Sequence, residues 1–376
     1  MAPSPVSRRR TDLDLLRVVA CIGIVLAHAL LIYAAEPRYH VKSATPWAPA
    51  TILYEIFRVA ILPLFFTLAG WSAVGALRRR TPGRFLRERV LRVLLPLFAG
   101  ILLLGPVIKW IELQQGRDLR LGGFRLVTPP DYGFVAFLGR YLTRIDTMTW
   151  SHLWFLAYLF IISVVTLPAL RWLAGRAPVA EVPGRLAVYL PAAGFALLIA
   201  GTGGYWPFLP NLAQDWANML WFIACFGLGA MLAAWPGYET RLRAEAWGLL
   251  ALGLLGFIVE LWLGPSTLGR IAVGLCAWGW IGGGLGIAGR YPPAPSRLLD
   301  WLGEATMPVY VLHHIPVLLL GVWLLAFGWG PVATIFGVWL GATAITLLVY
   351  RFCVRPFAGP RLLVGMPPAS PGARPG

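Results

Sequence analysis

The sequence predicts an all-α, polytopic helical membrane protein with about ten transmembrane helices and both termini in the cytoplasm. Three observations predict this class: 58% of the 376 residues are hydrophobic, only 13% are charged, and the mean hydropathy is +0.71. These values lie far from the averages of soluble proteins. They exclude a soluble enzyme, and they also exclude collagen-like, disulfide-stapled and intrinsically disordered chains.

Apolar runs long enough to cross a bilayer, about 20 residues each, fill most of the chain. They predict transmembrane helices at 14–35, 51–77, 93–112, 150–171, 186–206, 214–235, 246–263, 268–289, 302–327 and 330–352. The fifth segment is the weakest of the ten, because Pro191 and several glycines interrupt it. Membrane helices tolerate such residues where neighbouring helices satisfy the freed backbone groups.

Three regions follow from this pattern. Residues 1–12 form a basic cytoplasmic tail, residues 13–355 the transmembrane domain, and residues 356–376, rich in proline and glycine, a disordered cytoplasmic tail. The first helix is expected to be retained rather than cleaved as a signal peptide, since its apolar stretch is too long. The loop 113–149 is the only sizeable extramembrane segment expected, and it is too small to have a core of its own.

Basic residues dominate the charge: 32 Lys and Arg against 16 Asp and Glu give a net charge of +16. A nucleic-acid partner is one explanation of such an excess. With Arg8, Arg9 and Arg10 placed in the cytoplasm, however, most basic residues fall in loops on that same side, as the positive-inside rule requires. The excess of basic residues is therefore explained by membrane topology, and we expect membrane lipids and no nucleic acid as partners.

In the first helix, Arg17 and His28 are ionisable residues within hydrocarbon, where such groups are costly and mark functional sites or pairing networks. Their spacing is about three helical turns, roughly 16 Å, so both project from one face at different depths. A cation near the inner surface and a titratable base deeper in the bundle would suit a long anionic substrate. The alternative is that Arg17 only snorkels to the surface and His28 only bonds a neighbouring helix.

The ninth predicted helix carries Tyr310, His313 and His314 between two prolines, at a depth similar to that of His28. Prolines distort helices, so two histidines at this place are hard to explain as filler. Adjacent residues point about 100° apart on a helix and no carboxylate follows at helical spacing, so we predict no metal site here. A purely structural hydrogen bond by one of the two histidines is the alternative.

The cysteines predict neither a disulfide nor a zinc site, because they show no short repeated spacing. They lie in or at the end of apolar stretches, as Cys21, Cys225, Cys276 and Cys353. We expect them to be small apolar packing residues.

Further polar residues lie near the outer ends of predicted helices, where they would line a vestibule. Ser151, His152 and Trp154 begin the fourth helix, although Trp154 is also a natural interfacial anchor. Glu55 and Arg58, three residues apart in the second helix, are expected to pair with each other. The other polar residues that would either line this vestibule or cap helices are Asp215, Asn218 and Glu260.

The inner loop between the second and third helices is dense in arginine. Arg89 and Arg92, three residues apart at a predicted helix start, share a face and would bind phosphates bidentately. Contact with anionic lipid headgroups, combined with topology, explains the same charges at least as well.

Together these motifs resemble the acyltransferase-3 family of integral membrane acyltransferases, and within it the branch of glucan biosynthesis protein C. Five ordered motifs carry the resemblance: the R-x10-H pattern from Arg17 to His28, Pro-Leu-Phe-Phe-Thr-Leu-Ala-Gly at 63–70, Arg89-Val-Leu-Arg92, Ser-His-Leu-Trp-Phe-Leu at 151–156, and Tyr310-x-x-His-His-x-Pro. Ala69 departs from the pattern, because many members have Ser there. We expect no appended soluble esterase-like domain, so the membrane unit would act alone or with partners.

The resemblance implies a multi-pass protein of the bacterial cytoplasmic (inner) membrane. It implies transfer of an acyl group, acetyl or succinyl, from cytoplasmic acyl-CoA to a hydroxyl of a carbohydrate acceptor at the outer face. Acyl-CoA would be the donor substrate, and no permanently bound cofactor is expected. His28 would be the general base. The residues implied to hold the CoA phosphates are Arg17, Arg89 and Arg92, and those implied to orient the base or stabilise the oxyanion are His313, Tyr310 and Ser151-His152.

Other function classes remain open. An exporter of an anionic glycan or lipid-linked intermediate would use the same arginines and histidines as a translocation path, but it would move its substrate without releasing CoA. A non-catalytic membrane scaffold would leave five buried polar motifs unexplained. A membrane-bound O-acyltransferase of the His/Asn type does not account for the R-x10-H pattern of the first helix.

Overall fold

A computed structural model describes residues 10–120, 123–203 and 210–367 of the chain. Within these ranges the structure is helical apart from one hairpin, in which β1 (Arg117–Arg120) pairs antiparallel with β2 (Gly123–Leu126). The α-helices are α1 (Thr11–Leu31), α2 (Ala48–Leu77), α3 (Pro82–Arg89), α4 (Leu95–Leu103), α5 (Gly105–Gln114), α6 (Phe134–Thr143), α7 (Trp154–Val165), α8 (Leu167–Ala174), α9 (Leu190–Thr202), α10 (Trp216–Ala234), α11 (Pro236–Ala244), α12 (Ala246–Leu263), α13 (Thr267–Arg290), α14 (Arg297–Leu312), α15 (His314–Ala326), α16 (Pro331–Val349) and α17 (Ala358–Leu363). Short 3₁₀ segments are η2 (Ile145–Thr147), η3 (Ser151–Leu153) and η4 (Arg185–Tyr189), and π-helical segments are η1 (Val90–Leu94) and η5 (Tyr350–Val354).

Seven helices of the described chain are long and apolar enough to cross a membrane. They are α1, α2, η4 with α9, α10, α12, α13, and α16 with η5. Three further pairs of helices pass the same test together but are bent, which raises the number of candidate spans to as many as ten. Each span overlaps one of the predicted segments, so the expected all-α membrane architecture is confirmed. The end of the fifth predicted segment, 204–206, lies outside the described residues.

Prolines account for the positions of the three bends. The bend is 45° between α4 and α5, 61° between α7 and α8, and 62° between α14 and α15. Pro106 and Pro168 are the second residues of α5 and α8. A proline is tolerated in the first turn of a helix but cannot continue the preceding one. Pro316 lies in the first turn of α15. The last bend leaves His313 at the break between two helices.

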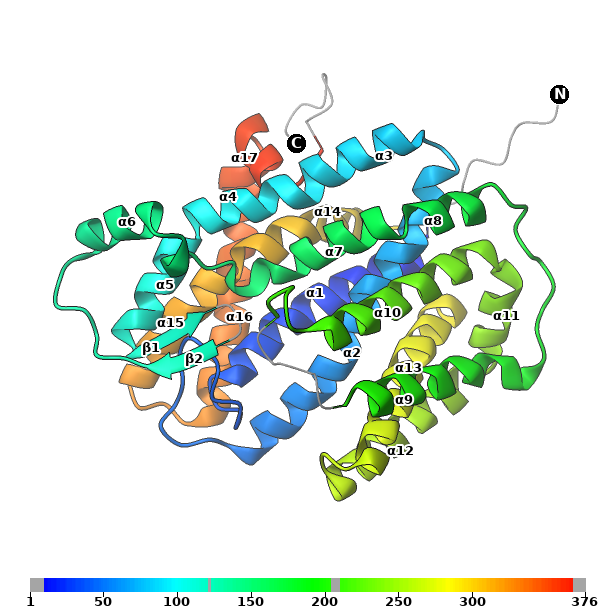
Figure 1. Ribbon diagram of the computed structural model, residues 1–376, viewed down its shortest axis with the longest axis horizontal. Coiled ribbons are helices and arrows are strands. Elements are labelled where there is room, and N and C mark those ends of the chain that lie inside the picture. Colours follow the sequence, from blue (N-terminus) through cyan, green and yellow to red (C-terminus); the bar gives the residue numbers. More distant parts are fainter. Residues whose placement is uncertain (1–9, 121–122, 204–209, 368–376) are drawn as a thin grey trace.

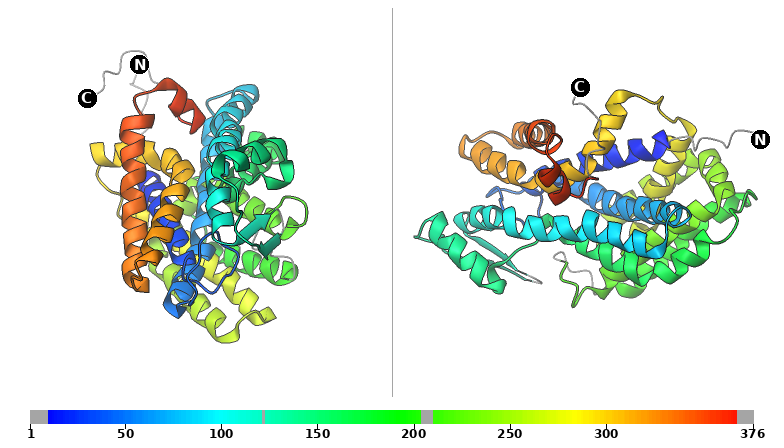
Figure 2. Two further views of the ribbon diagram at one scale, coloured as in Figure 1. Left: turned by 90° about the vertical axis from the view of Figure 1, so that its left-hand side faces the viewer. Right: turned by 90° about the horizontal axis from the view of Figure 1, so that it is seen from above.

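Helix α1 is at the centre of the molecule. It contacts α2, α13, α14, α15 and α16. The left view in Figure 2 has α1 (blue) between the C-terminal helices (orange) and the α3–α4 segment (cyan), and in Figure 1 α7 and α10 pass in front of it. Residues near the end of α1, including His28, are therefore surrounded by helices from both halves of the sequence.

Helices α2 and α10 pack backbone against backbone. A Cβ atom at Gly70 would lie 1.9 Å from the carbonyl oxygen of Phe226, and one at Gly229 would lie 1.8 Å from the carbonyl oxygen of Thr67. Small residues permit such close approach between membrane helices. The contact explains the glycine that ends the motif at 63–70, and it fixes the spacing of two helices that line the cavity described below.

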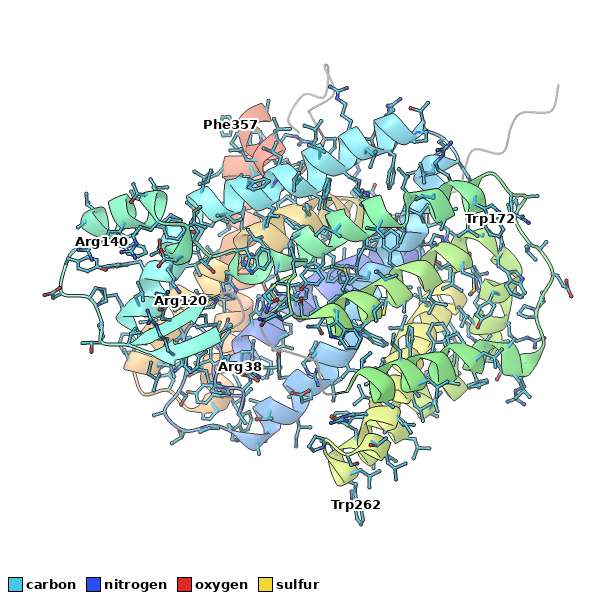
Figure 3. All side chains as sticks on the ribbon, in the orientation of Figure 1. Arg38, Arg120, Arg140, Trp172, Trp262 and Phe357 are labelled. Atoms are coloured by element: carbon cyan, nitrogen blue, oxygen red, sulfur yellow. The ribbon has the colours of Figure 1, made fainter. Side chains whose placement is uncertain are left out.

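The surface of the bundle is that of a lipid-facing protein. Trp262, at the end of α12, is 89% exposed, and Figure 3 shows it projecting from the edge of the molecule. Tryptophan at helix ends is typical of membrane–water interfaces. Figure 3 also places Arg38, Arg120 and Arg140 at the end of the molecule opposite Trp172, in agreement with the predicted alternation of loops. All four cysteines are free.

Two segments differ from expectation. The loop 113–149 contains the β1–β2 hairpin and α6, neither of which was predicted. The tail beyond residue 355 was expected to be disordered, but its described part forms α17, and the guanidinium of Arg361 donates to Glu304 at 3.1 Å. This expectation failed because a long-range ion pair that orders a short helix leaves no trace in composition. Residues 368–376 and 1–9 lie outside the described part.

Candidate active site

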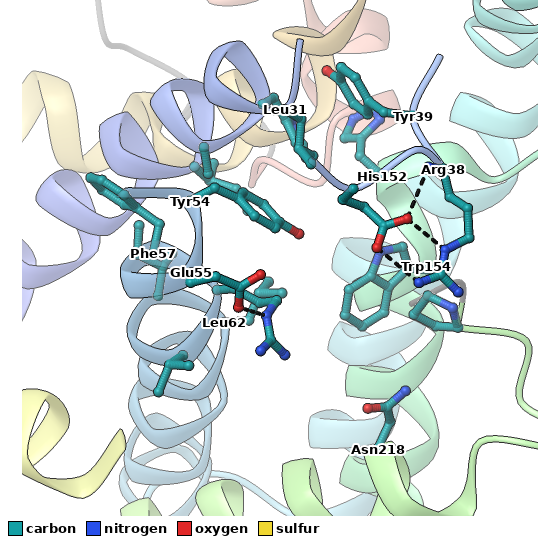
Figure 4. A pocket seen from close by; sticks show the side chains of 18 of the residues that line it. Leu31, Arg38, Tyr39, Tyr54, Glu55, Phe57, Leu62, His152, Trp154 and Asn218 are labelled. Atoms are coloured by element: carbon teal, nitrogen blue, oxygen red, sulfur yellow. Dashed lines mark hydrogen bonds and ion pairs between the residues drawn. The ribbon is translucent and has the colours of Figure 1, made fainter. Parts of the chain in front are cut away.

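A cavity of about 630 Å³ lies between α1, α2, α7, α10, α13 and α14. In Figure 4, Tyr54 and Glu55 of α2 lie on one side of it, and His152 and Trp154 lie on the other. This volume is in the usual range for a small-molecule site. The predicted site residues that line it are His28, Tyr310, Ser151, His152, Trp154, Glu55 and Arg58.

Four of the five histidines of the sequence line this cavity, and the fifth, His313, is buried against two of them. Ring centroids of His28 and His313 are 5.0 Å apart, and those of His28 and His314 are 4.7 Å apart. The ring of His152 stacks on that of His314 at 4.6 Å, and the ring of His40 lies 5.1 Å from that of His314. Histidines that are distant in sequence thus form one cluster. The sequence analysis singled out all of them except His40.

Hydrogen bonds assign the tautomers of His28 and His313. The Nδ1 atom of His313 lies 3.0 Å and 2.8 Å from the carbonyl oxygens of Val309 and Tyr310. Carbonyl oxygens only accept, so Nδ1 of His313 carries the proton and its Nε2 is an acceptor in the neutral ring. Nδ1 of His28 lies 2.8 Å from that Nε2 and must donate to it. Neutral His28 therefore keeps an unprotonated Nε2, the form a general base requires.

Several buried polar atoms at the histidine cluster have no hydrogen-bond partner within the described chain. They are the hydroxyl of Tyr39, Nδ1 of His152 and Nε2 of His314. Buried polar atoms are nearly always hydrogen-bonded in folded proteins.

Tyr310 and His152 hold two helices together. The hydroxyl of Tyr310 donates to the carbonyl oxygen of His152 at 2.6 Å, and Nε2 of His152 lies 3.1 Å from the carbonyl oxygen of Val311. These reciprocal bonds join η3 to α14. Tyr310 was predicted to be a catalytic residue, but its hydroxyl is hydrogen-bonded to the backbone of His152. It therefore positions the segment that carries Ser151.

The sequence analysis missed a second polar array at the outer rim of the cluster. His40, in the loop after α1, bonds Ser151 through Nε2 at 3.0 Å and Glu112 of α5 through Nδ1. The ionisable pair Lys109 and Glu112 within an apolar segment was a signal that could have found it. His40 lies in an irregular loop, where no periodic pattern distinguishes a site residue.

The predicted pair Glu55–Arg58 forms in α2, with Nε of Arg58 2.6 Å from the carboxylate of Glu55. A second ion pair on the cavity wall joins Arg38 to Glu36 at 2.6 Å, and the dashed lines of Figure 4 mark both. The wall contains these charges beside apolar and aromatic side chains. Such a lining offers hydrogen bonds to a polyhydroxylated ligand.

The three predicted phosphate-binding arginines do not line the cavity. Arg17 lies near the start of α1, where its guanidinium donates to Asp14 at 2.9 Å and to the hydroxyl of Ser72 at 2.7 Å. Arg89 stacks over the ring of Phe85, and Arg92 is exposed. The structure has both on a helical segment that begins at Pro82, earlier than the predicted start at residue 93.

Ser72 supplies a hydroxyl close to the position where many similar sequences have Ser and this chain has Ala69. It lies three residues further along α2, so both positions are on one side of the helix. Its hydroxyl accepts from Arg17 and donates to the carbonyl oxygen of Leu68 at 2.8 Å. The departure at Ala69 therefore does not remove a hydroxyl from this part of α2.

The histidine cluster also has the spacing of a possible metal site. The ring nitrogens of His28, His313 and His314 lie within 4.8 Å of one another. One nitrogen of His313 faces two carbonyl oxygens and the other faces His28, so a metal would have to displace a bonded proton. Neutral hydrogen-bonded rings fit these contacts without an ion, and the absence of a metal stays a prediction.

Comparison with known proteins identifies the family. A family model described as an acyltransferase domain matches residues 10–351, which is nearly the whole chain. The chain belongs to the acyltransferase-3 family. It is similar to glucans biosynthesis protein C of Salmonella heidelberg (strain SL476), with 22% identity over 86% of this chain and 85% of the relative. It is also similar to that of Salmonella agona (strain SL483), with 23% identity over the same shares. No solved structure matches the chain significantly. As an acyltransferase-3 protein with many membrane-spanning helices, the chain is a membrane acyltransferase.

Proposed function

We propose that this protein transfers an acyl group, acetyl or succinyl, from cytoplasmic acyl-CoA to a hydroxyl of a glycan outside the cytoplasmic membrane. The observation that carries the proposal is that His28 lines the cavity while its Nδ1 lies 2.8 Å from Nε2 of His313. That hydrogen bond assigns the proton of the neutral ring to Nδ1 and leaves Nε2 unprotonated. A neutral imidazole with one nitrogen fixed and the other open is a general base in position.

The chemistry asked of His28 is removal of the proton from the acceptor hydroxyl. The deprotonated oxygen attacks the carbonyl carbon of the acyl group, a C–O bond forms, and the bond to the leaving group breaks. The proton on Nε2 of His28 then returns to solvent or to the leaving group. His313 is a positioning residue in this scheme, because it acts through His28.

The donor would approach from the opposite end of α1. Arg17 is about three helical turns, roughly 16 Å, from His28, and it would hold CoA phosphates together with Arg89 and Arg92. Guanidinium groups suit this role because they bind phosphate oxygens bidentately. The acyl end of the donor would then extend along α1 towards the cavity.

The acceptor class follows from the relatives and from the cavity wall. The similar proteins are named for glucan biosynthesis. The paired charges of Glu55 and Arg58 on the cavity wall are suited to hydroxyl groups of a sugar. We therefore propose a glucan acceptor, in a bacterial cytoplasmic membrane with both termini of the chain inside.

The test uses the full-length protein in proteoliposomes with acetyl-CoA or succinyl-CoA and a glucan. We expect release of free CoA thiol that depends on the glucan, together with an ester on the glucan, and we expect His28→Ala to lose both. The matched control is Ser163→Ala, a buried serine of α7 that bonds only its own helix at Leu159. Movement of glucan across the bilayer without CoA release would favour an exporter and contradict the proposal.

A further inference from the structure

A serine, a histidine and a glutamate lie in series at the rim of the cavity. The hydroxyl oxygen of Ser151 is 3.0 Å from Nε2 of His40, and Nδ1 of His40 bonds the carboxylate of Glu112. The three residues come from η3, from the loop after α1 and from α5. A hydroxyl bonded to an imidazole that is itself held by a carboxylate is the arrangement that activates serine nucleophiles on many unrelated folds.

The carboxylate of Glu112 is fully buried and fully hydrogen-bonded. Its Oε1 accepts from Nζ of Lys109 and, at 2.6 Å, from the backbone N–H of Leu119. Lys109 is in turn paired with Asp118 at 2.6 Å. The other carboxylate oxygen faces Nδ1 of His40 and accepts its proton. Neutral His40 is then left with Nε2 as acceptor for the hydroxyl of Ser151.

The backbone of Ser151 is strained. Its φ angle is +45°, and within the described chain Leu212 is the only other residue besides glycine with a positive φ. Left-handed backbone at a side chain other than glycine costs free energy and is concentrated at functional sites. A sharp, strained turn also presents the nucleophilic serine in other acyl-transferring enzymes.

Ser151 and His40 line the same cavity as His28. The ring of His314 lies between the two bases, with its centroid 4.7 Å from that of His28 and 5.1 Å from that of His40. One base therefore serves the serine, and the other remains for a second hydroxyl.

We propose that Ser151 carries the acyl group as a covalent ester between the donor and the acceptor. This inference rests on the proposed function and divides the acyl transfer into two chemical steps. In the first step, Nε2 of His40 takes the hydroxyl proton, the Ser151 oxygen bonds the carbonyl carbon of the thioester, and the C–S bond breaks. CoA leaves as a thiolate, which takes a proton from water, and His40 keeps the serine proton.

In the second step, the acceptor hydroxyl attacks the serine ester. Nε2 of His28 takes the acceptor proton, a new C–O bond forms to the acceptor, and the bond to the Ser151 oxygen breaks. That oxygen recovers its proton from His40, and His28 releases its own to water. Both histidines and the serine are then as they began, and the net change is one thioester for one oxygen ester and one thiol.

The experiment follows the covalent ester directly. Full-length protein in lipid nanodiscs is incubated with radiolabelled acetyl-CoA or succinyl-CoA without acceptor, denatured, and mapped by mass spectrometry. We expect label on the peptide that contains Ser151. In native membranes that contain the acceptor, His28→Ala should accumulate at least about ten times more label than the natural protein, because only the second step is blocked.

Variants separate a nucleophile from a merely structural serine. Ser151→Ala should carry no label, and His40→Gln should form label at least about 100-fold more slowly. Ser151→Cys should be labelled as a thioester that neutral hydroxylamine releases, whereas the oxygen ester of Ser151 resists it. Ser163→Ala should behave as the natural protein. Melting temperature and elution profile in detergent identify any variant that does not fold.

Two results distinguish the inference from the proposed function. If Ser151→Ala still esterifies glycans at the natural rate, or if His28→Ala carries no label in a host whose glycan esters depend on this protein, transfer is direct and the serine ester is overturned. If the natural protein takes no label and its deletion changes no glycan ester, the acyltransferase function itself is overturned.

Discussion

Nδ1 of His28 lies 2.8 Å from Nε2 of His313, and the other nitrogen of His313 faces the carbonyl oxygens of Val309 and Tyr310. The bend of 62° between α14 and α15 leaves His313 at the helix break. The prolines of this segment therefore have a direct consequence for chemistry, since they place the acceptor that fixes the protonation pattern of His28.

Loss of the His313 imidazole, which accepts the hydrogen bond from His28, should impair turnover more than donor binding. In His313→Ala, Nδ1 of His28 has no partner from residue 313, and we expect kcat to fall about 100-fold or more while KM for the donor changes little. His313→Gln keeps an amide oxygen that can accept, so it should retain more activity than His313→Ala. Steady-state kinetics of CoA release measure both, and equal activity of His313→Ala and the natural protein would contradict this role.

Arg17 should act on donor binding. Arg17→Ala removes a guanidinium that we assign to CoA phosphates, so we expect KM for acyl-CoA to rise about tenfold or more with a smaller change in kcat. Arg171→Ala, which removes an arginine from the last turn of α8, is the control and should leave KM unchanged. A rise in KM of the same size for both variants would point to general surface charge instead.

The contact between α2 and α10 should be sensitive to one methyl group. Gly229→Ala puts a Cβ atom against the carbonyl oxygen of Thr67, whereas Gly227→Ala on the same helix meets no atom within 4 Å. We expect the first substitution to cost about 1–3 kcal/mol of stability and the second to cost little. Melting temperatures in detergent compare the two, and equal values would show that the helices separate easily.

Acid should weaken the hairpin through Asp118. Burial alone would raise the pKa of Asp118, but the hydrogen bond and charge of Lys109, with Arg120 and Arg125, outweigh burial and lower the pKa from 3.8 to about 2. A folded-state pKa below the unfolded value gives stability that is fully present above about pH 4 and is lost as the pH falls towards 2. Melting temperature measured from pH 6 to pH 3 should therefore fall more steeply for the natural protein than for Asp118→Asn. Parallel curves for the two proteins would contradict this assignment.

Metal removal should leave activity intact. The contacts of His28 and His313 are those of hydrogen-bonded neutral rings, so dialysis against a strong chelator is expected to leave CoA release within about twofold of the untreated rate. Loss of activity that added zinc restores, together with a stoichiometric metal content, would assign His28, His313 and His314 as ligands instead.

Much of the fold was predictable because membrane burial acts on each segment separately. Apolar length alone predicted the spans, and Pro308 and Pro316 marked the bent span formed by α14 and α15. The tail helix α17 and the hairpin were not predictable, since each depends on ion pairs between residues that are distant or irregularly spaced, such as Arg361 with Glu304. Local periodicity contains no information on such pairs.

The candidate site was predictable to the extent that its residues stood out against hydrocarbon. His28, His152 and His313 were recognised in this way, and they converge in the structure. His40 was not, because a histidine in a polar loop is unremarkable until the fold brings it to Ser151 and Glu112. The sequence also suggested that Arg17 and His28 share one helix face, but only the structure shows that Arg17 does not line the cavity.

The most direct test of the central claim is the amount of ester-linked acyl group on envelope and secreted glycans. It is measured by mass spectrometry after alkaline release, in host cells that lack the protein and carry either the natural gene or His28→Ala. The account predicts an ester that disappears on deletion, returns with the natural protein and does not return with His28→Ala, and the released mass identifies the acyl group. The same esters in all three strains would contradict it.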